Sequence, residues 1–200
     1  PSGSTIEGVL WTKEVQDVSS STTGSSVFDF DGDNKAEVVY NDECFLRVFD
    51  GTTGDVLFER KNSSRTGNEN PVITDVDGDF KAEIVVVANN DKLADRDRCW
   101  EQTNLPNGQA YLPENANAYA VDGIDEEGTV GIFVWGDAQD NWVPTRRLWN
   151  QHAYSITNIS EDGTVPAQTP VHYTEARTNS FRLNTQGEGL YNAPDLSIES

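Results

Sequence analysis

Two short acidic segments have the residue types and the spacing of calcium-binding loops. One runs from Asp29 to Glu37 and the other from Asp75 to Glu83. Ca²⁺ takes about six to eight oxygen ligands from carboxylates, backbone carbonyls and water. We expect acids at loop positions 1, 3 and 5, a backbone carbonyl at position 7 and a carboxylate at position 9 to converge on one ion. The predicted ligands are Asp29, Asp31, Asp33, the Lys35 carbonyl and Glu37 in the first loop, and Asp75, Asp77, Asp79, the Lys81 carbonyl and Glu83 in the second.

Two structural Ca²⁺ ions explain these loops better than two acidic turns that bind nothing. Three carboxylates held close together repel one another unless a cation compensates their charge. Mg²⁺ is the second choice, because it demands stricter octahedral geometry and retains more water. Gly32 and Gly78 relieve crowding where the backbone of each loop curls.

The loops belong to a repeated unit with an offset of 46 residues. In each unit an apolar run precedes the loop and a run rich in β-branched residues follows it, which predicts a strand, a loop and a strand. The alternating segment 45–49, a turn at 50–55 and a returning strand at 56–58 complete the first unit as a four-stranded sheet. A sheet of this size and a repeat of this length are typical of a propeller blade.

The remaining chain is assigned by composition and alternation. We expect one β domain over residues 1–192 without amphipathic helices. Its parts are repeat units at about 26–60 and 71–136, an insertion at 89–117, strands at 118–123 and 131–136, an aromatic cap at 142–166 and a short strand at 180–184. Residues 193–200 form a C-terminal strand or a linker to a following module.

The two units resemble FG-GAP/VCBS repeats, the blades of integrin-α-like β-propellers. The resemblance covers Ser26 to Ala88 and extends more loosely to Trp135. Residues 145–166 resemble the segment that follows such repeats in large bacterial surface proteins, and residues 193–196 resemble the start of an Ig-like module. The resemblance implies an extracellular, calcium-stabilised and non-enzymatic module at the cell surface, with a role in adhesion or in a surface assembly.

The chain departs from the family pattern in two ways. Loop position 6, often Gly in the family, is Asn34 in one loop and Phe80 in the other. Asn tolerates a left-handed backbone, whereas Phe adopts it only with strain, so we expect the second loop to differ in shape. Two repeats are also too few for a closed propeller, which has at least about four blades.

We therefore predict an all-β fold of propeller-like blades, in which the two clear repeats alone do not complete a propeller. Either the remaining strands form degenerate blades or a neighbouring chain completes the fold. An open sheet edge invites pairing with another chain, and strand 195–199 is a candidate donor. A head-to-tail contact of this kind produces a filament unless it closes into a ring.

Composition excludes several classes of partner. The chain has 14 basic and 34 acidic residues and a net charge of −20, which argues against binding nucleic acid or anionic membranes. No segment approaches the run of about 20 apolar residues that a membrane span needs. The chain contains no Met and has no signal peptide at Pro1, so we expect a processed product or a fragment.

Two further features fit an extracellular protein. Cys44 and Cys99 are the two cysteines, and we expect one disulfide between them, with two buried thiols as the alternative. Asn62 and Asn158 lie in N-glycosylation sequons, with unmodified surface turns as the alternative.

No catalytic residue is predicted. Asp137, Asp140 and Glu175 could act as the acid pair of a glycoside hydrolase, with Trp135 and Trp142 stacking on sugar rings. We favour aromatic residues that fill the core and acids that lie in turns. A carbohydrate-binding, lectin-like module is the stronger alternative to a structural one. His152 and His172 lack partners at zinc-site spacing, and we expect His152 to be packed and hydrogen-bonded.

Overall fold

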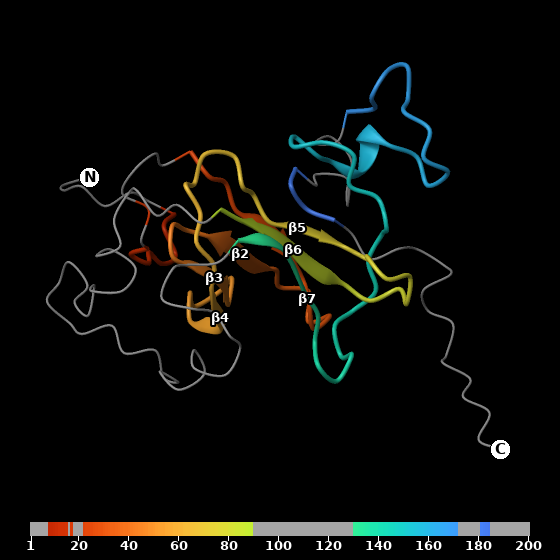
Figure 1. Ribbon diagram of the computed structural model, residues 1–200. Coiled ribbons are helices and arrows are strands. Elements are labelled where there is room, and N and C mark those ends of the chain that lie inside the picture. Colours follow the sequence, from red (N-terminus) through yellow and green to blue (C-terminus); the bar gives the residue numbers. More distant parts are fainter. Residues whose placement is uncertain (1–7, 16, 18–21, 90–129, 172–180, 185–200) are drawn as a thin grey trace, which may run out of the picture. The chain divides into compact units, whose positions relative to one another are not determined.

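The computed structural model describes residues 8–15, 17, 22–89, 130–171 and 181–184 (Figure 1). Several sequence-based predictions therefore fall outside the described residues. They concern most of the insertion, the strand at 118–123, the C-terminal strand, and the residues Cys99, His172 and Glu175.

The described residues form seven strands and one short 3₁₀ helix. The strands are β1 (Ser26–Phe28), β2 (Glu37–Asn41), β3 (Phe45–Phe49), β4 (Val56–Lys61), β5 (Val72–Thr74), β6 (Glu83–Ala88) and β7 (Gly131–Trp135), and the helix is η2 (Ile156–Asn158). Hydrogen bonds order them in one sheet as β1-β2-β3-β4 and in a second as β5-β6-β7 (Figure 1). The all-β prediction and the four-stranded first sheet are confirmed, while the propeller-like arrangement stays a prediction.

The chain divides into two compact units that each draw on several segments. The first unit takes its described residues from Pro1–Ser25, Lys35–Pro71 and Val86–Phe133, and the second from Ser26–Asn34, Val72–Val85 and Val134–Ser200. Both sequence repeats contribute to both units, so a repeat does not correspond to a unit.

Strands β2, β3 and β4 form the antiparallel core of the first unit. Val39 pairs with Val48, which in turn pairs with Phe58, and Leu46 is fully buried. The alternating sequence of β3 predicts one buried and one exposed face, but all five of its residues are buried. Its central Arg47 is tolerated inside because Asp42 and Glu59 both pair with its guanidinium.

Lys61, at the end of β4, is 9% exposed, and burial lowers the pKa of its ammonium from 10.5 to about 8. Folding therefore disfavours the charged form, and the resulting destabilisation is complete below pH 8 and disappears as the pH rises towards 10.5. We therefore expect the wild type to gain stability between pH 8 and pH 10.5, and Lys61→Met to lack this gain. Urea unfolding of both proteins at pH 7 and pH 10 checks this, since the free energy of unfolding of the wild type should rise relative to that of the variant at the higher pH. A stability difference between the two proteins that is the same at both pH values would contradict it.

Strands β5 and β6 carry the core of the second unit. They pair antiparallel, with Ile73 opposite Ile84, and both side chains are fully buried. Segment 181–184 lies beside β1 through a single parallel bridge between Val27 and Leu183. The strand expected at 180–184 is therefore reduced to one bridge among the residues described.

The residues assigned to the aromatic cap lie in the second unit. Tyr154 is fully buried and stacks on Trp149 with ring centroids 4.4 Å apart. Arg182 lies over Trp149 and donates Nη1–H to the His152 carbonyl at 2.9 Å. His152 itself is exposed, which corrects the expectation of a packed side chain.

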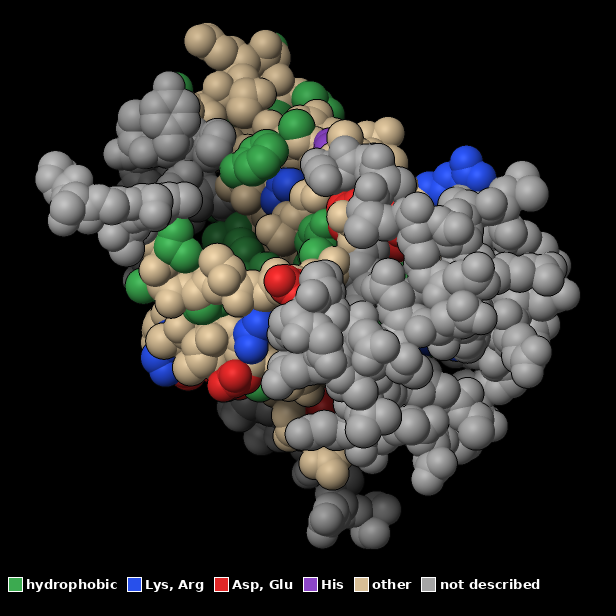
Figure 2. Space-filling model, turned by 90° about the vertical axis from the view of Figure 1, so that its left-hand side faces the viewer, with side chains coloured by type: hydrophobic (Ala, Val, Ile, Leu, Met, Phe, Trp, Pro, Cys, Tyr) green, Lys and Arg blue, Asp and Glu red, His purple; other side chains and the backbone are tan. Residues whose placement is uncertain are grey.

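Several large apolar side chains remain exposed, among them Leu57, Val130 and Ile132. On the face drawn in Figure 2, the hydrophobic side chains of the described residues occur in separate places among polar and charged ones. The described residues include no helix that is long and apolar enough to cross a membrane.

Candidate functional site

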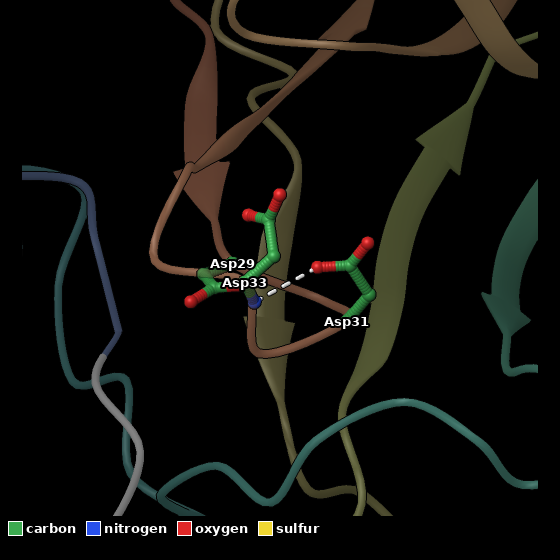
Figure 3. Close-up of side chains that lie close together, drawn as sticks. All are labelled: Asp29, Asp31 and Asp33. Carbon is green, nitrogen blue, oxygen red and sulfur yellow. Dashed lines mark hydrogen bonds between the residues drawn. The ribbon is translucent and has the colours of Figure 1, made fainter.

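The first acidic loop follows β1 and is shaped by the carboxylate of Asp29. Asp29 Oδ1 accepts hydrogen bonds from Gly32 N at 2.7 Å and Asp33 N at 3.1 Å, and its Oδ2 accepts one from Asn34 N at 2.9 Å. Asp31 Oδ1 accepts from Asp33 N at 3.0 Å, which is the dashed line in Figure 3. A side chain that binds backbone N–H groups further along the chain fixes a tight turn without help from other segments.

This turn brings three predicted ligands of the first loop together. Asp29, Asp31 and Asp33 each offer a carboxylate oxygen within 4.8 Å of the others (Figure 3). Lys35 and Glu37 lie in the other compact unit, where Glu37 begins β2. Their part in the first site stays a prediction.

The second loop connects β5 to β6 and repeats the hydrogen bonds of the first. Asp75 Oδ1 accepts from Gly78 N at 2.6 Å, and Asp75 Oδ2 accepts from Phe80 N at 3.2 Å. Asp77 Oδ1 accepts from Asp79 N at 3.2 Å, as Asp31 does from Asp33 in the first loop. The sequence repeat is therefore also a repeat of local structure.

A carboxylate from the following strand joins the second loop. Asp75, Asp77 and Glu83 offer oxygens within 4.8 Å of one another, and Glu83 Oε2 accepts from Val76 N at 2.7 Å. Asp79 is not in this group, and its Oδ1 instead accepts from Lys81 N at 2.7 Å. Three of the five predicted ligands of this loop are therefore brought together, as in the first loop.

The second loop is the more buried of the two. The Asp75 side chain is fully buried, and Glu83 is 8% exposed. The pKa of Glu83 is raised to about 7, first by burial and then by the charges of Asp77, Asp79 and Asp75, while the hydrogen bond from Val76 N–H acts in the opposite direction. Carboxylates with this burial and spacing need a compensating cation to remain ionised together.

The backbone at position 6 has the left-handed conformation in both loops. Asn34 has φ 67° and Phe80 has φ 76°, so the expected strain at Phe80 is present, but position 6 does not distinguish the two loops. Further contacts hold Phe80 in place. Its carbonyl accepts from Thr145 N at 3.1 Å, and Arg147 lies over its ring at 5.5 Å.

Residues 142–147 contact both loops, which was not predicted from the sequence. Val143 and Thr145 act through backbone N–H groups, which every residue but proline has, so residue type carries no signal. Arg147 does carry one, because its Nε lies 3.8 Å from Asp75 Oδ2. An arginine among aromatic residues could have been considered as a partner for the acidic loops.

The acids considered for a glycoside hydrolase have other surroundings among the described residues. Asp137 Oδ2 accepts from Gln139 N at 3.0 Å and Asn141 N at 2.9 Å, and hydrogen bonding, mainly from Asn141, lowers its pKa. Asp140 lies beside Asp79 of the second loop; desolvation first and then the charge of Asp79 raise the pKa of Asp140.

The other predicted sites are placed as follows. Asn62 is 1% exposed, and its amide donates to Asn41 Oδ1 at 2.8 Å, so a glycan there would have to replace a buried hydrogen bond. Asn158 lies in η2, where its Oδ1 accepts from Ser155 N at 2.5 Å. Cys44 is buried, while Cys99 lies outside the described residues, so both glycosylation and the disulfide stay predictions.

Comparisons with known proteins give little further information. No protein-family model matches the chain, and no curated protein does. Among solved structures, the chain is similar to the V. cholerae biofilm matrix protein Bap1, with 27% sequence identity and a TM-score of 0.47. The match covers 72% of this chain and 20% of that chain, so this chain spans about a fifth of that protein's length. A TM-score of this size does not establish a shared fold, and the function is therefore argued from the acidic loops themselves.

Proposed function

We propose that this protein is an extracellular, calcium-stabilised structural or adhesion module in which each acidic loop holds one Ca²⁺ ion. The observation that carries the proposal is the group of Asp75, Asp77 and Glu83, whose oxygens lie within 4.8 Å of one another and of which Asp75 and Glu83 are buried. The matching group of Asp29, Asp31 and Asp33, built by the same backbone turn, supports a second site.

The repulsion within such a group is large compared with the net stability of a domain. Two unit charges 4.8 Å apart repel by about 3 kcal/mol at the effective dielectric constant of about 20 that suits protein sites. Net stabilities are only about 5–15 kcal/mol. A bound divalent cation turns this repulsion into attraction, and it does so only in the folded chain, where the loop holds the carboxylates together.

The donor atoms favour calcium. Both groups consist of carboxylates, and neither includes His or Cys among the described residues. Oxygen-only donors suit a hard cation, and the flexible coordination of Ca²⁺ fits a loop better than the strict octahedron of Mg²⁺. The second loop joins two strands and the first leaves a strand directly, so we assign the ions a structural role rather than a sensing one.

Calcium titration of the purified, calcium-free protein by calorimetry tests the proposal. We expect two bound ions in the wild type and one in each of Asp29→Asn and Asp75→Asn. Asn keeps an oxygen that can accept backbone hydrogen bonds but removes the charge of a ligand, so it tests binding more than folding. Asp137→Asn is the matched control, since Asp137 also accepts backbone hydrogen bonds in a turn. No calcium binding to the wild type, or unchanged stoichiometry in both loop variants, would refute the proposal.

We further propose that the two repeats are FG-GAP/VCBS repeats and that the module is non-enzymatic and assembles at the cell surface. The regular repeat of loop hydrogen bonds supports the first point, and the turns around Asp137 and Asp140 support the second. Electron microscopy in calcium distinguishes a monomer, a ring and a fibre. A compact monomer at high concentration would contradict self-association.

A further inference from the structure

One extended segment, Trp142–Arg147, contacts both acidic loops, and we call it the bridging segment. On the first loop, Val143 N donates to the Phe30 carbonyl at 2.9 Å, and the Trp142 ring lies against that of Phe30 with centroids 4.6 Å apart. A Cβ atom added to Gly32 would lie 3.2 Å from Val143 Cγ1, so the backbone also approaches closely. Phe30 stands between the candidate ligands Asp29 and Asp31.

The same segment continues along the second loop. Pro144 forms an antiparallel bridge with Lys81, and Thr145 N donates to the Phe80 carbonyl at 3.1 Å. The Arg146 carbonyl then accepts from Asp75 N at 3.3 Å and from Thr74 Oγ1 at 2.8 Å. All these partners lie within the second compact unit.

We infer that the bridging segment couples the two loops, so that Ca²⁺ bound in one loop raises the Ca²⁺ affinity of the other. The inference rests on the proposed calcium sites and adds a regulatory property to them. It does not require a new ligand, because the coupling passes through the backbone of residues 142–147.

The coupling follows from how the contacts are spaced. Val143 and Thr145 are separated by Pro144 alone, whose ring fixes φ and limits how far the two N–H groups can move independently. Closing Asp29 and Asp31 around an ion fixes the Phe30 carbonyl between them, and that carbonyl holds Val143. A fixed Val143 in turn holds Thr145 against Phe80, where the second loop must close.

The expected sign is positive. Ordering the bridging segment costs conformational entropy, and binding of the first ion already orders this segment. The second ion then binds with a smaller loss of entropy, because its loop is already restrained. Coupling between sites in proteins typically amounts to a factor of about 5–150 in affinity. We expect a value at the lower end, about 5-fold, because the contacts are few and lie on one segment.

Calorimetric calcium titrations of three variants test the inference. In Asp29→Asn, which leaves only the second loop able to bind, we expect the affinity of that loop to fall about 5-fold relative to its affinity in the wild type. Pro144→Gly loosens the bridging segment without touching a ligand. The Pro144→Gly variant should still bind two ions per chain. When Asp29→Asn is added to it, the fall in the calcium affinity of the second loop should be less than half of that in the wild-type background. Pro166→Gly is the matched control and should leave the coupling unchanged.

Trp142 supplies an independent readout that does not depend on folding of the Pro144→Gly variant. In Asp29→Asn, calcium binding at the second loop should still change the fluorescence of Trp142, because the bridging segment carries the change to its contact with Phe30. The added substitution Trp142→Phe should remove this response while one ion still binds.

The outcomes separate the inference from the proposed function. If the wild type binds no calcium, the proposed function fails, and the inference fails with it. Suppose that two ions bind, but that in Asp29→Asn the affinity of the second loop is unchanged and calcium does not alter the fluorescence of Trp142. The proposed calcium sites are then retained and the coupling is overturned. If the coupling persists in a folded Pro144→Gly variant, the role of the bridging segment is overturned.

Discussion

Removing calcium from this protein is expected to lower its free energy of unfolding by about 5 kcal/mol when free calcium begins at about 100 times the dissociation constant. Each ion that binds only the folded chain contributes about 2.7 kcal/mol at that concentration, and two independent ions contribute twice as much. The physical reason is that chelation restores the repulsion among Asp75, Asp77 and Glu83, whose oxygens lie within 4.8 Å of one another. For a chain of 200 residues, this corresponds to a fall in melting temperature of about 10–20 °C.

Thermal unfolding with and without a calcium chelator measures this effect. The double variant Asp29→Asn, Asp75→Asn serves as the control, because it should melt at the same temperature in calcium and in chelator. Excess Mg²⁺ added to the chelated wild type should restore less stability than calcium does. A melting temperature that does not respond to the chelator in the wild type would contradict the calcium-stabilised module.

Replacing Arg146 by leucine is expected to cost about 3–5 kcal/mol of unfolding free energy, since each buried acceptor left unsatisfied costs about 1–3 kcal/mol. The guanidinium is buried and donates to Tyr154 Oη at 2.9 Å, the Ile156 carbonyl at 3.2 Å and the Ile159 carbonyl at 2.9 Å. It also forms an ion pair with Glu161 at 2.6 Å. Leucine leaves these acceptors without their charged donor, and the acceptors buried with it cannot turn to water.

Arg147→Leu provides a control on the neighbouring residue. Its side chain is 58% exposed and lies 3.8 Å from Asp75 Oδ2, so its loss should cost about 1 kcal/mol or less. Urea unfolding of both variants in saturating calcium makes the comparison. If Arg146→Leu cost no more than Arg147→Leu, Arg146 would not be the centre of the aromatic cap.

The calcium loops and the aromatic cap depend on contacts between residues at different separations along the chain. This difference explains which features could be predicted from the sequence. Within each loop the turn could be predicted, because the loop N–H groups that donate to the Asp29 and Asp75 carboxylates lie within five residues along the chain. The difference in loop shape expected from Phe80 is not found at position 6, because Phe80 has the same left-handed backbone as Asn34. The strand after each loop and the strand at 45–49 were predicted from short β-branched and aromatic runs for the same local reason, and they are β2, β6 and β3 in the structure.

Predictions that needed long-range information were less complete. The alternation of strand β3 predicted two unlike faces, but both faces are buried, because Asp42 and Glu59 compensate Arg47 and allow it inside. The strand at 180–184 was predicted from its apolar residues, yet its described part makes one bridge, to Val27. Hydrophobic pattern alone does not say how many backbone partners a segment will find.

Two acidic loops of the same design in a β-rich chain could be predicted from the amino-acid types alone, since their acids and their turn-forming hydrogen bonds are local. The surroundings of the loops depend on contacts between residues that are distant along the chain. Thr74 meets the Arg146 carbonyl across 72 residues, and Asn184 meets the Ile73 carbonyl across 111. The acceptors in these contacts are backbone carbonyls, which every residue has, so residue types do not predict them. The contacts of the bridging segment and the burial of Asp75 and Glu83 therefore follow from the tertiary structure.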